Sequence, residues 1–499
     1  MDFFVNQYLL GKNSSVEHAE LKRLQLFKDH QTPAQLVTRD FDPVLHRTMQ
    51  RFGVTNDQLT NLYDFFAQTT DYQGQPLHTE DLKLAVDYQI GTGNNFREVR
   101  DGGRLAATIY FAGGTIGQIH HIDWYDQTGS LTLRNTYDIR GFKAVDEFFG
   151  QDGHEFNARY YRPDGQLYLE RYFVKSVQNT PINSLNILKD WHGQDHWFAS
   201  ENEMFAFFLD ELNRAHGENN VFIADRPAVA IDPILHMHSK VHRYLWLPMS
   251  HVNDGQDPLK APLNSLLQKN ALTENLQRWD GIIVMTQAQA RVLSQRLGKS
   301  ARVLTINGTP VKKAAKRVKM TDRLPNQLIS VGRLGYDKQT DQLLQVFAKI
   351  KAAVPDAKLT LYGYGAPNDT ANFKQLAKDL KIDDAVEFAD YQYPLDAAFD
   401  QAQLLLNTSR IDAQPLAMGE ALGHGVPVVS YDFSYGPDEM IANYENGRLI
   451  ALNHPASMVK AVVELLSSPA KLQQLSDHAY DDLDNISAAV TWKQWQAVK

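Results

Sequence analysis

The segment 409–427 contains two carboxylates, Asp412 and Glu420, which lie eight positions apart. A loop with Pro415 separates them, and residues 417–422 have the pattern of the first turns of a helix. Unpaired amide groups and the helix dipole let a helix start bind phosphate. One carboxylate beside the phosphate can accept hydrogen bonds from ribose hydroxyls, and the other from the hydroxyls of a second sugar. The segment therefore suits a sugar nucleotide, and a helix with an acidic first turn and no ligand explains it equally well.

Two cations lie in the sequence VGRLGYDKQTDQLL: Arg333 just after a predicted strand, and Lys338 at the start of the next predicted helix. Fixed positive charge there can stabilise the charge that builds on a diphosphate as a glycosidic bond breaks. Ordinary surface cations are the alternative. Because positive charge near a helix start is unfavourable, we favour a function for this pair. If these cations neutralise the diphosphate, no metal is required, and the sequence contains no convincing Asp-x-Asp metal motif.

Glycine and histidine at two other predicted strand ends are weaker candidates. Gly363 lies in the sequence YGYG, where glycine allows a ligand to approach the backbone and also simply makes turns. His251 ends the run VHRYLWLPMSH, which predicts a strand whose end points toward the same site. The histidines at positions 236, 238 and 242 have neither an acidic partner nor a third ligand in the sequence, so we interpret them as structural.

Composition excludes several classes of protein. The chain has 499 residues, of which 43% are hydrophobic and 22% charged, and this predicts two or three globular domains. No apolar run approaches the roughly 20 residues of a membrane span, and the start MDFFVNQYLL lacks the basic region of a signal peptide. The absence of cysteine excludes disulfides and fits a reducing cytoplasm. A net charge of −9 argues against a nucleic-acid binder.

One short stretch departs from this acidic balance. Two interpretations fit it: a solvated linker, which we favour, or a groove for a polyanionic acceptor. The cations of this basic stretch are Lys312, Lys313, Lys316, Arg317, Lys319 and Arg323.

Alternating strands and helices predict an α/β protein. Residues 1–80 and 180–308 have the βαβ pattern of an N-terminal Rossmann-like domain. Residues 81–179 contain short β-rich runs separated by glycine turns, which predict an antiparallel insertion in that domain. Residues 309–475 predict a C-terminal Rossmann-like domain for a nucleotide sugar. Residues 476–499 are expected to pack as a helix back on the first domain.

Four features of the possible site occur together: the Arg333/Lys338 pair, YGYG at 362–365, the Asp412/Glu420 pair and SYDFSYGPDEMI at 430–441. The combination resembles the retaining GT-B glycosyltransferases of family 4. It is most similar to the branch that adds α-glucose or α-N-acetylglucosamine to poly(glycerol- or ribitol-phosphate) wall teichoic acids. Enzymes that glycosylate serine-rich adhesins are related to this branch. The resemblance spans nearly the whole chain, and it implies two Rossmann-like domains that face a cleft, with an antiparallel β-rich insertion in the first.

The resemblance also implies residue roles. The donor would be a UDP-sugar, with retention at the anomeric carbon and with neither a cofactor nor a metal. Arg333 and Lys338 would hold the diphosphate, and Glu420 the ribose. Asp412 would carry the carboxylate that touches donor-sugar hydroxyls. The remaining donor-site positions are backbone amides and loop residues: Leu416, Ala417, Met418, Gly363, Ser15 and His251.

Four positions depart from the family pattern. The family usually has Glu at 412 and Gly at 413 and 415, where this chain has Asp, Ala and Pro. Aspartate is one methylene shorter, which can leave a sugar hydroxyl out of reach. Pro248 takes the place of a first histidine, so that His251 is the remaining one. The chain is then either an active transferase with altered donor preference, which we favour, or a weakened relative that pairs with an active subunit.

The predicted function is a hexosyltransferase that moves glucose or N-acetylglucosamine from a UDP-sugar to a wall teichoic acid polyol-phosphate. The alternative is a weakly active or non-catalytic subunit of a protein O-glycosyltransferase complex that acts on cell-surface adhesins. We expect a cytoplasmic protein with access to the inner face of the membrane and without a nucleic-acid partner. We also expect it to form homo-oligomers, or hetero-oligomers with a homologous transferase, through the β-rich insertion.

Overall fold

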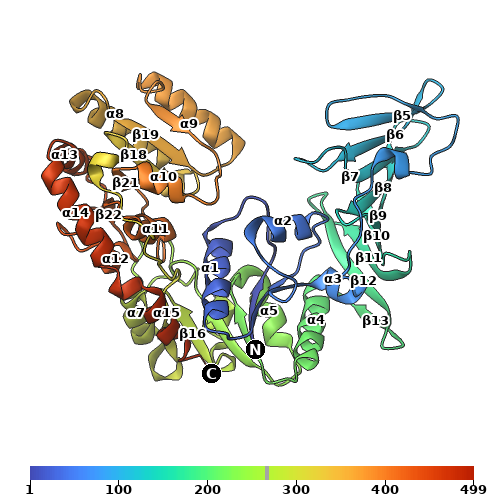
Figure 1. Ribbon diagram of the computed structural model, residues 1–499. Coiled ribbons are helices and arrows are strands. Elements are labelled where there is room, and N and C mark those ends of the chain that lie inside the picture. Colours follow the sequence, from blue (N-terminus) through green and yellow to red (C-terminus); the bar gives the residue numbers. More distant parts are fainter. Residues whose placement is uncertain (265–268, 499) are drawn as a thin grey trace. The chain divides into compact units, whose positions relative to one another are not determined.

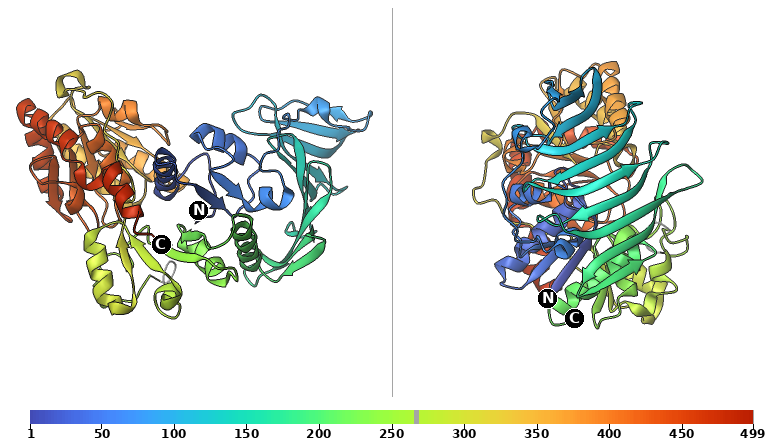
Figure 2. Two further views of the ribbon diagram at one scale, coloured as in Figure 1. Left: turned by 60° about the horizontal axis from the view of Figure 1, so that its bottom comes forward. Right: turned by 90° about the vertical axis from the view of Figure 1, so that its right-hand side faces the viewer.

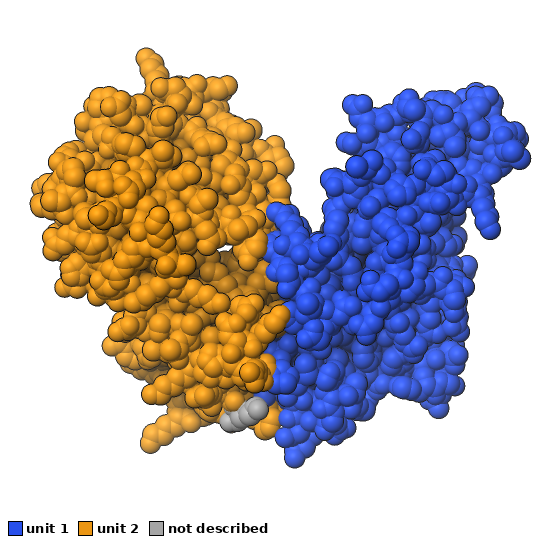
Figure 3. All heavy atoms as spheres, viewed as in Figure 1, with its two compact units in different colours: residues 1–11, 33–224, 229–241 blue, residues 12–32, 225–228, 242–499 orange. Residues whose placement is uncertain are grey.

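The computed structural model describes residues 1–264 and 269–498 (Figure 1; Figure 2). The chain forms two compact units, which Figure 3 shows in different colours. The first unit comprises residues 1–11, 33–224 and 229–241, and the second comprises the rest of the described chain. Within the described ranges, no helix has the length and apolar character needed to cross a bilayer.

The first unit contains four parallel strands in the order β14-β1-β2-β3. All four are buried along their length, as expected of a parallel sheet that is covered on both faces. The strands are β1 (Asp2–Asn6), β2 (Ala34–Thr38), β3 (Leu59–Asn61) and β14 (Val221–Ala224), and the nearby helices are α2 (Leu45–Phe52), α3 (Leu62–Ala67), α4 (Glu201–Ala215) and α5 (Pro227–His236).

The β-rich insertion is a ten-stranded antiparallel sheet in which consecutive strands are neighbours (Figure 2, right). It continues past the predicted limit at residue 179, because β12 and β13 are its last two strands and α4 packs against them. The strands are β4 (Gln89–Ile90), β5 (Phe96–Asp101), β6 (Arg104–Phe111), β7 (Ile119–Tyr125), β8 (Leu131–Asp138), β9 (Phe142–Phe149), β10 (Glu155–Tyr161), β11 (Leu167–Lys175), β12 (Pro181–Trp191) and β13 (Gln194–Phe198).

A buried ion network joins this sheet to α3. The guanidinium of Arg140 donates to Asp138 at 2.8 Å and to Asp64 at 2.7 Å. Burial alone would raise the pKa of Asp64, but the hydrogen bond from His46 and the charge of Arg140 outweigh it and lower this pKa to about 2. The network therefore keeps Asp64 ionised while it holds the two elements together.

The second unit contains two groups of parallel strands, β15-β16-β17 and the six-stranded β20-β19-β18-β21-β22-β23. The strands are β15 (His242–Trp246), β16 (Gly281–Val284), β17 (Val303–Thr305), β18 (Gln327–Val331), β19 (Lys358–Tyr362), β20 (Val386–Phe388), β21 (Leu404–Asn407), β22 (Val428–Asp432) and β23 (Gly447–Ala451). The helices are α1 (Ser15–Asp29), α6 (Lys269–Leu272), α7 (Gln287–Leu297), α8 (Thr340–Ala353), α9 (Pro367–Asp379), α10 (Asp396–Gln401), α11 (Leu416–Gly423), α12 (Pro437–Met440), α13 (Pro455–Leu466), α14 (Pro469–Asp481) and α15 (Ala488–Trp495).

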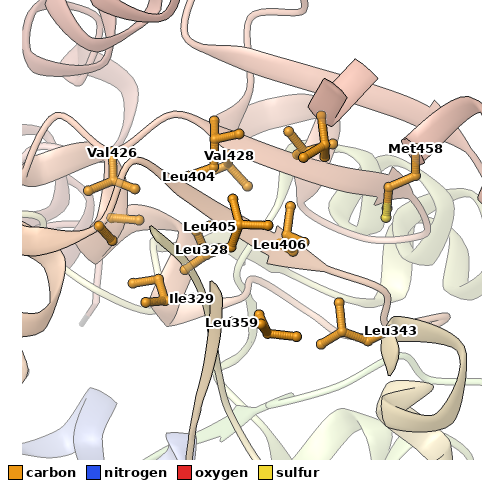
Figure 4. Packing of buried hydrophobic residues seen from close by; sticks show 14 of the residues in the cluster. Leu328, Ile329, Leu343, Leu359, Leu404, Leu405, Leu406, Val426, Val428 and Met458 are labelled. Carbon is orange, nitrogen blue, oxygen red and sulfur yellow. The ribbon is translucent and has the colours of Figure 1, made fainter. Parts of the chain in front are cut away.

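The order of the six-stranded sheet fixes where a ligand can bind. Its first strand, β18, has β19 on one side and β21 on the other, so the direction in which strands are added reverses between β18 and β21. In open α/β sheets, ligands bind at the carboxyl ends of the strands beside such a reversal. The interior of this sheet is apolar: Figure 4 shows Leu328 of β18, Leu405 of β21 and Val428 of β22 within one buried cluster.

The C-terminal helix α15 packs on aromatic side chains from early in the chain. Trp495 stacks on Trp246 of β15 with 5.8 Å between ring centroids, and its ring meets Phe27 of α1 edge-on. Trp492 stacks on His30 at 4.2 Å. These contacts tie α15 to elements that the sequence assigned to the first domain.

Candidate functional site

Arg333 and Lys338 lie directly after β18, on the loop that leads to α8. A short 3-10 helix, Tyr336–Lys338, ends at Lys338, and the carbonyl of Lys338 accepts a hydrogen bond from the hydroxyl of Thr408 at 3.1 Å. Thr408 follows β21, so a contact across the strand reversal holds the backbone of Lys338 in place. Arg333 thus lies just after the strand, as predicted, and Lys338 lies two residues before α8 rather than at its start.

Lys338 and Asp412 form an ion pair across the reversal point. The distance between Nζ of Lys338 and Oδ2 of Asp412 is 2.7 Å, and both side chains are about one-quarter exposed, at 25% and 23%. The other carboxylate oxygen of Asp412 accepts the amide of Ala413 at 2.8 Å, and its carbonyl accepts the amide of Tyr435 at 3.1 Å. Two residues that are far apart in the sequence therefore meet at the place where the sheet order predicts a ligand.

Arg333 has a different partner. Its guanidinium pairs with Asp337 at 2.6 Å, and the two side chains are 54% and 48% exposed. Ion pairs this exposed contribute about 0 to 1 kcal/mol. Arg333 can therefore leave Asp337 for a phosphate at little cost, whereas Lys338 is already held in position.

The structure gives Gly363 a packing role. Its φ of +144° is outside the range of other residues, and an added Cβ would lie 1.8 Å from the carbonyl oxygen of Gly332. Its amide donates to the carbonyl of Asp390 at 2.9 Å. Glycine is thus needed here so that the loops after β18 and β19 can approach each other. Contact of Gly363 with a ligand stays a prediction.

Helix α11 begins at Leu416, directly after Pro415 and one residue earlier than the sequence pattern placed its start. The amide of Met418 donates to the carbonyl of Pro415 at 3.1 Å, which leaves the amides of Leu416 and Ala417 as the ones that helix geometry cannot pair. Of the three α11 residues assigned to the donor site, these two have the amides that are better placed to bind a phosphate.

Glu420 meets a residue that the sequence analysis did not single out. Its Oε1 lies 2.5 Å from Nζ of Lys22 on α1, and the two side chains are 27% and 26% exposed. One turn earlier on the same helix, the ring of His18 lies beside Tyr393, with 5.2 Å between centroids. The helical pattern of α1 shows only that Lys22 and His18 lie outside its buried face. The sequence around them does not indicate which residues they contact.

Ser15 is the first residue of α1 and is exposed. The N-cap is its neighbour Ser14, whose hydroxyl accepts the amide of Val16 at 3.3 Å, while Glu17 accepts the amide of Ser14 at 2.9 Å. This capping box fixes the start of α1. Ser15 therefore does not take part in the cap, and its assignment to the donor site stays a prediction.

His251 does not end a strand, and this part of the prediction is wrong. β15 ends at Trp246 because Pro248, just beyond it, has no N–H for a sheet hydrogen bond. His251 lies in the loop that follows, fully buried, with Nε2 2.9 Å from the carbonyl of Pro258 and with its ring stacked on that of Tyr435 at 6.4 Å.

The environment of His251 sets its protonation. Burial lowers the pKa of the imidazole, which is therefore neutral at pH 7. Because a carbonyl oxygen only accepts, Nε2 carries the proton and Nδ1 is left as an acceptor. Among the described residues, Nδ1 of His251 has no hydrogen-bond partner. The histidine can accept one hydrogen bond, and it cannot act as a cation.

The basic stretch 312–323 divides into two kinds of residue. Arg323 is buried and donates to backbone carbonyls, including those of Phe399 at 2.8 Å and His424 at 2.6 Å. Arg317 pairs with Asp481 on α14, and Lys312 with Asp29 at 3.2 Å. Arg323 and Arg317 therefore anchor the segment to the domain that follows it, and Lys312 pairs with α1, so the segment is not a solvated linker throughout.

A known family of proteins matches the part of the chain that contains the six-stranded parallel sheet. Residues 311–482 match the family model "Glycosyl transferases group 1". The chain carries a glycosyltransferase domain. Residues 88–181, within the antiparallel insertion of this glycosyltransferase, match the model "GtfB middle domain". The predicted resemblance to glycosyltransferases is confirmed.

Several proteins are similar to this glycosyltransferase over most of its length. The "UDP-N-acetylglucosamine--peptide N-acetylglucosaminyltransferase GtfA subunit" of Streptococcus gordonii is 22% identical over 97% of this chain and 95% of its own. The "Poly(glycerol-phosphate) alpha-glucosyltransferase" of Bacillus subtilis (strain 168) is 20% identical over 87% of this chain and 64% of its own.

A solved structure confirms the GT-B fold. The pneumococcal O-GlcNAc transferase GtfA, solved in complex with UDP and GlcNAc, superposes on this glycosyltransferase with a TM-score of 0.85 at 16% identity. The superposition covers 99% of this chain and 97% of the other. The predicted architecture, two Rossmann-like domains with an antiparallel insertion, is therefore correct. Of the candidate site residues, all but Ser15 and His251 lie within the matched domain at 311–482.

Proposed function

We propose that this chain is a retaining hexosyltransferase that moves glucose or N-acetylglucosamine from a UDP-sugar to a wall teichoic acid polyol-phosphate. In this proposal residues 309–475 bind the donor, and residues 1–80 and 180–308 serve the acceptor. The similarity to an enzyme named for poly(glycerol-phosphate) and α-glucose supports this acceptor and donor. The proposal includes a cytoplasmic reaction at the inner face of the membrane and no nucleic-acid partner.

The observation that carries the proposal is the Lys338–Asp412 ion pair at the strand reversal. A diphosphate at this place would lie between Lys338, the exposed Arg333 and the amides of Leu416 and Ala417 at the start of α11. Negative charge grows on the diphosphate as the bond to the sugar breaks, and fixed cations and amides stabilise it most at that point. These groups supply the positive charge without a metal or a cofactor.

Asp412 connects the leaving group to the sugar. Each of its carboxylate oxygens is already engaged once, by Lys338 and by the amide of Ala413. A carboxylate accepts about four hydrogen bonds, so Asp412 can still accept from donor-sugar hydroxyls while it orients Lys338. In this way the shorter side chain serves both the sugar and the cation that holds the diphosphate.

A transfer assay tests the proposal. The purified protein is incubated with UDP-glucose or UDP-N-acetylglucosamine and with poly(glycerol-phosphate) or poly(ribitol-phosphate), and the product linkage is read by NMR. We expect an α-linked product with one of the donors, and strong loss of product in Lys338→Met and Asp412→Ala. Lys378→Met, an exposed change on α9, is the matched control. Absence of turnover with every pairing of donor and acceptor would contradict the proposal.

A second function has its own support. The insertion matches a GtfB middle domain, and one relative is named as a GtfA subunit of a peptide N-acetylglucosaminyltransferase. The chain would then be a weakly active or non-catalytic subunit that acts on adhesins together with a homologous transferase. Incubation with a serine-rich peptide, with and without such a homologue, separates the two functions. Transfer to peptide that appears only when the homologue is added would favour this second function.

A further inference from the structure

Lys22 is a fixed cation beside the carboxylate proposed to hold the ribose. Its ammonium lies 2.5 Å from Oε1 of Glu420, and about one-quarter of each side chain is exposed. The pair therefore remains open to a ligand on one side. Because a carboxylate has about four acceptor positions, ribose hydroxyls can bind Glu420 while Lys22 stays in place.

The helix that carries Lys22 is rigidly anchored. The next residue, Arg23, is buried and donates to both oxygens of Asp225 at 2.8 and 2.7 Å. Its guanidinium also lies 4.4 Å from the centre of the Trp246 ring. With the capping box at its start, α1 is fixed at both the N-terminal turn and the middle. Lys22 thus projects from a support that does not need to be ordered when a ligand arrives.

Further contacts on the same side of α1 and its preceding loop reach the loop after β20. Nε2 of His18 lies 2.9 Å from the hydroxyl of Tyr391, and burial lowers the pKa of His18, so the imidazole is neutral. Lys12 pairs with Asp390 at 2.8 Å. Lys22 is therefore the member of this group whose positive charge is directed at Glu420.

We infer that Lys22 is a positioning residue, which holds the carboxylate of Glu420 in the orientation that accepts the ribose hydroxyls. Glu420 has a long side chain, and fixing its rotamers on binding would otherwise cost conformational entropy. With Lys22 in place, that ordering has already occurred in the free protein. The inference rests on the proposed function, because it requires a UDP-linked donor whose ribose binds Glu420.

The experiment compares two ligands that differ by one hydroxyl. Dissociation constants for UDP and 2′-deoxy-UDP are measured by calorimetry on the full chain, for the wild type, Lys22→Met, Lys22→Arg and Glu420→Gln. We expect Lys22→Met to weaken UDP by about 3- to 10-fold and 2′-deoxy-UDP by less than 2-fold, since the effect passes through the ribose contact. Glu420→Gln should likewise bring the dissociation constants of UDP and 2′-deoxy-UDP closer together. Lys22→Arg should largely keep the wild-type ratio of the two constants.

Controls separate the inference from simpler effects. Lys28→Met changes an exposed lysine of the same helix and is expected to leave both constants unchanged. If Lys22 merely attracts phosphate or supports the fold, both ligands weaken by the same factor, and the inference is overturned. If Glu420→Gln brings the two dissociation constants closer together and Lys22→Met does not, the inference about Lys22 fails while the proposed function stands. If the wild type binds neither ligand, the proposed function fails as well.

Discussion

Replacing Lys338 by methionine is the change that most directly challenges the phosphate site. The substitution keeps the length and apolar stem of the side chain and removes the ammonium group. In the structure this ammonium lies 2.7 Å from Oδ2 of Asp412. The backbone carbonyl of Lys338 accepts a hydrogen bond from the hydroxyl of Thr408. We expect the variant to fold normally, because both side chains of the ion pair are partly exposed and such a pair adds little stability.

The expected loss of UDP affinity follows from two opposing contributions. A hydrogen bond to a charged group contributes about 1.5 to 3 kcal/mol. From this we subtract about 0.5 kcal/mol, because Lys338 already pairs with Asp412 in the free protein and shares that contact with the ligand. The net loss is about 1 to 2.5 kcal/mol, which corresponds to about 5- to 60-fold in the dissociation constant of UDP.

Calorimetric titration with UDP at fixed pH and ionic strength measures this loss. The decisive comparison repeats the substitution in an Asp412→Asn background. If Lys338 contacts the diphosphate, Lys338→Met weakens UDP in both backgrounds. If it only neutralises Asp412, the loss disappears once Asp412 is uncharged, and the reasoning is refuted. Lys378→Met on α9 controls for the loss of one positive charge elsewhere on the surface.

Three further predictions concern stability. Gly363→Ala should lower the free energy of unfolding by about 2 kcal/mol or more in urea, since its Cβ would lie 1.8 Å from a backbone oxygen, whereas Gly103→Ala, with open space around it, should not. Arg323→Met should lower the free energy of unfolding by about 3 kcal/mol, because it leaves buried carbonyls without hydrogen-bond donors. Lys316→Met, a change at an exposed position, should lower it by about 0.5 kcal/mol or less. The lowered pKa of His251 means that the unfolded chain takes up a proton near pH 6.5 before the folded one does, so stability falls as pH drops below about 6.5, and His251→Gln should flatten that slope.

Each of these expectations has an opposing result. Equal urea midpoints for the two glycine variants would show that the loops after β18 and β19 are not in close contact. If Arg323→Met leaves the free energy of unfolding unchanged, the carbonyls that Arg323 binds have found other hydrogen-bond donors. An unchanged pH slope in His251→Gln would show that other histidines account for the dependence.

The second Rossmann-like domain was predictable from local patterns. Strands such as β21 and β22 are short, largely apolar segments between helical segments, which is typical of a parallel sheet covered on both faces. The position of Arg333 just after a strand follows from the apolar run of β18. The start of α11 was predicted to within one residue, from the helical pattern that follows the loop with Pro415.

Other features depend on contacts that no local pattern records. The pairing of Lys22 with Glu420 requires the arrangement of α1 beside α11, and the pattern of α1 shows only which of its faces is apolar. The sheet of the insertion extends to Phe198, although composition changes near residue 179, because β12 and β13 join it by backbone hydrogen bonds. The end of β15 at Trp246 was predictable from Pro248, and the sequence analysis extended the strand wrongly to His251.

The central claim is that a diphosphate binds at the carboxyl ends of β18 and β21. A crystal structure of the protein with UDP tests it most directly. We predict phosphate oxygens within hydrogen-bonding distance of Nζ of Lys338 and of the guanidinium of Arg333, and ribose hydroxyls on Glu420. A diphosphate bound at another place, with Lys338 still paired only with Asp412, would contradict the account.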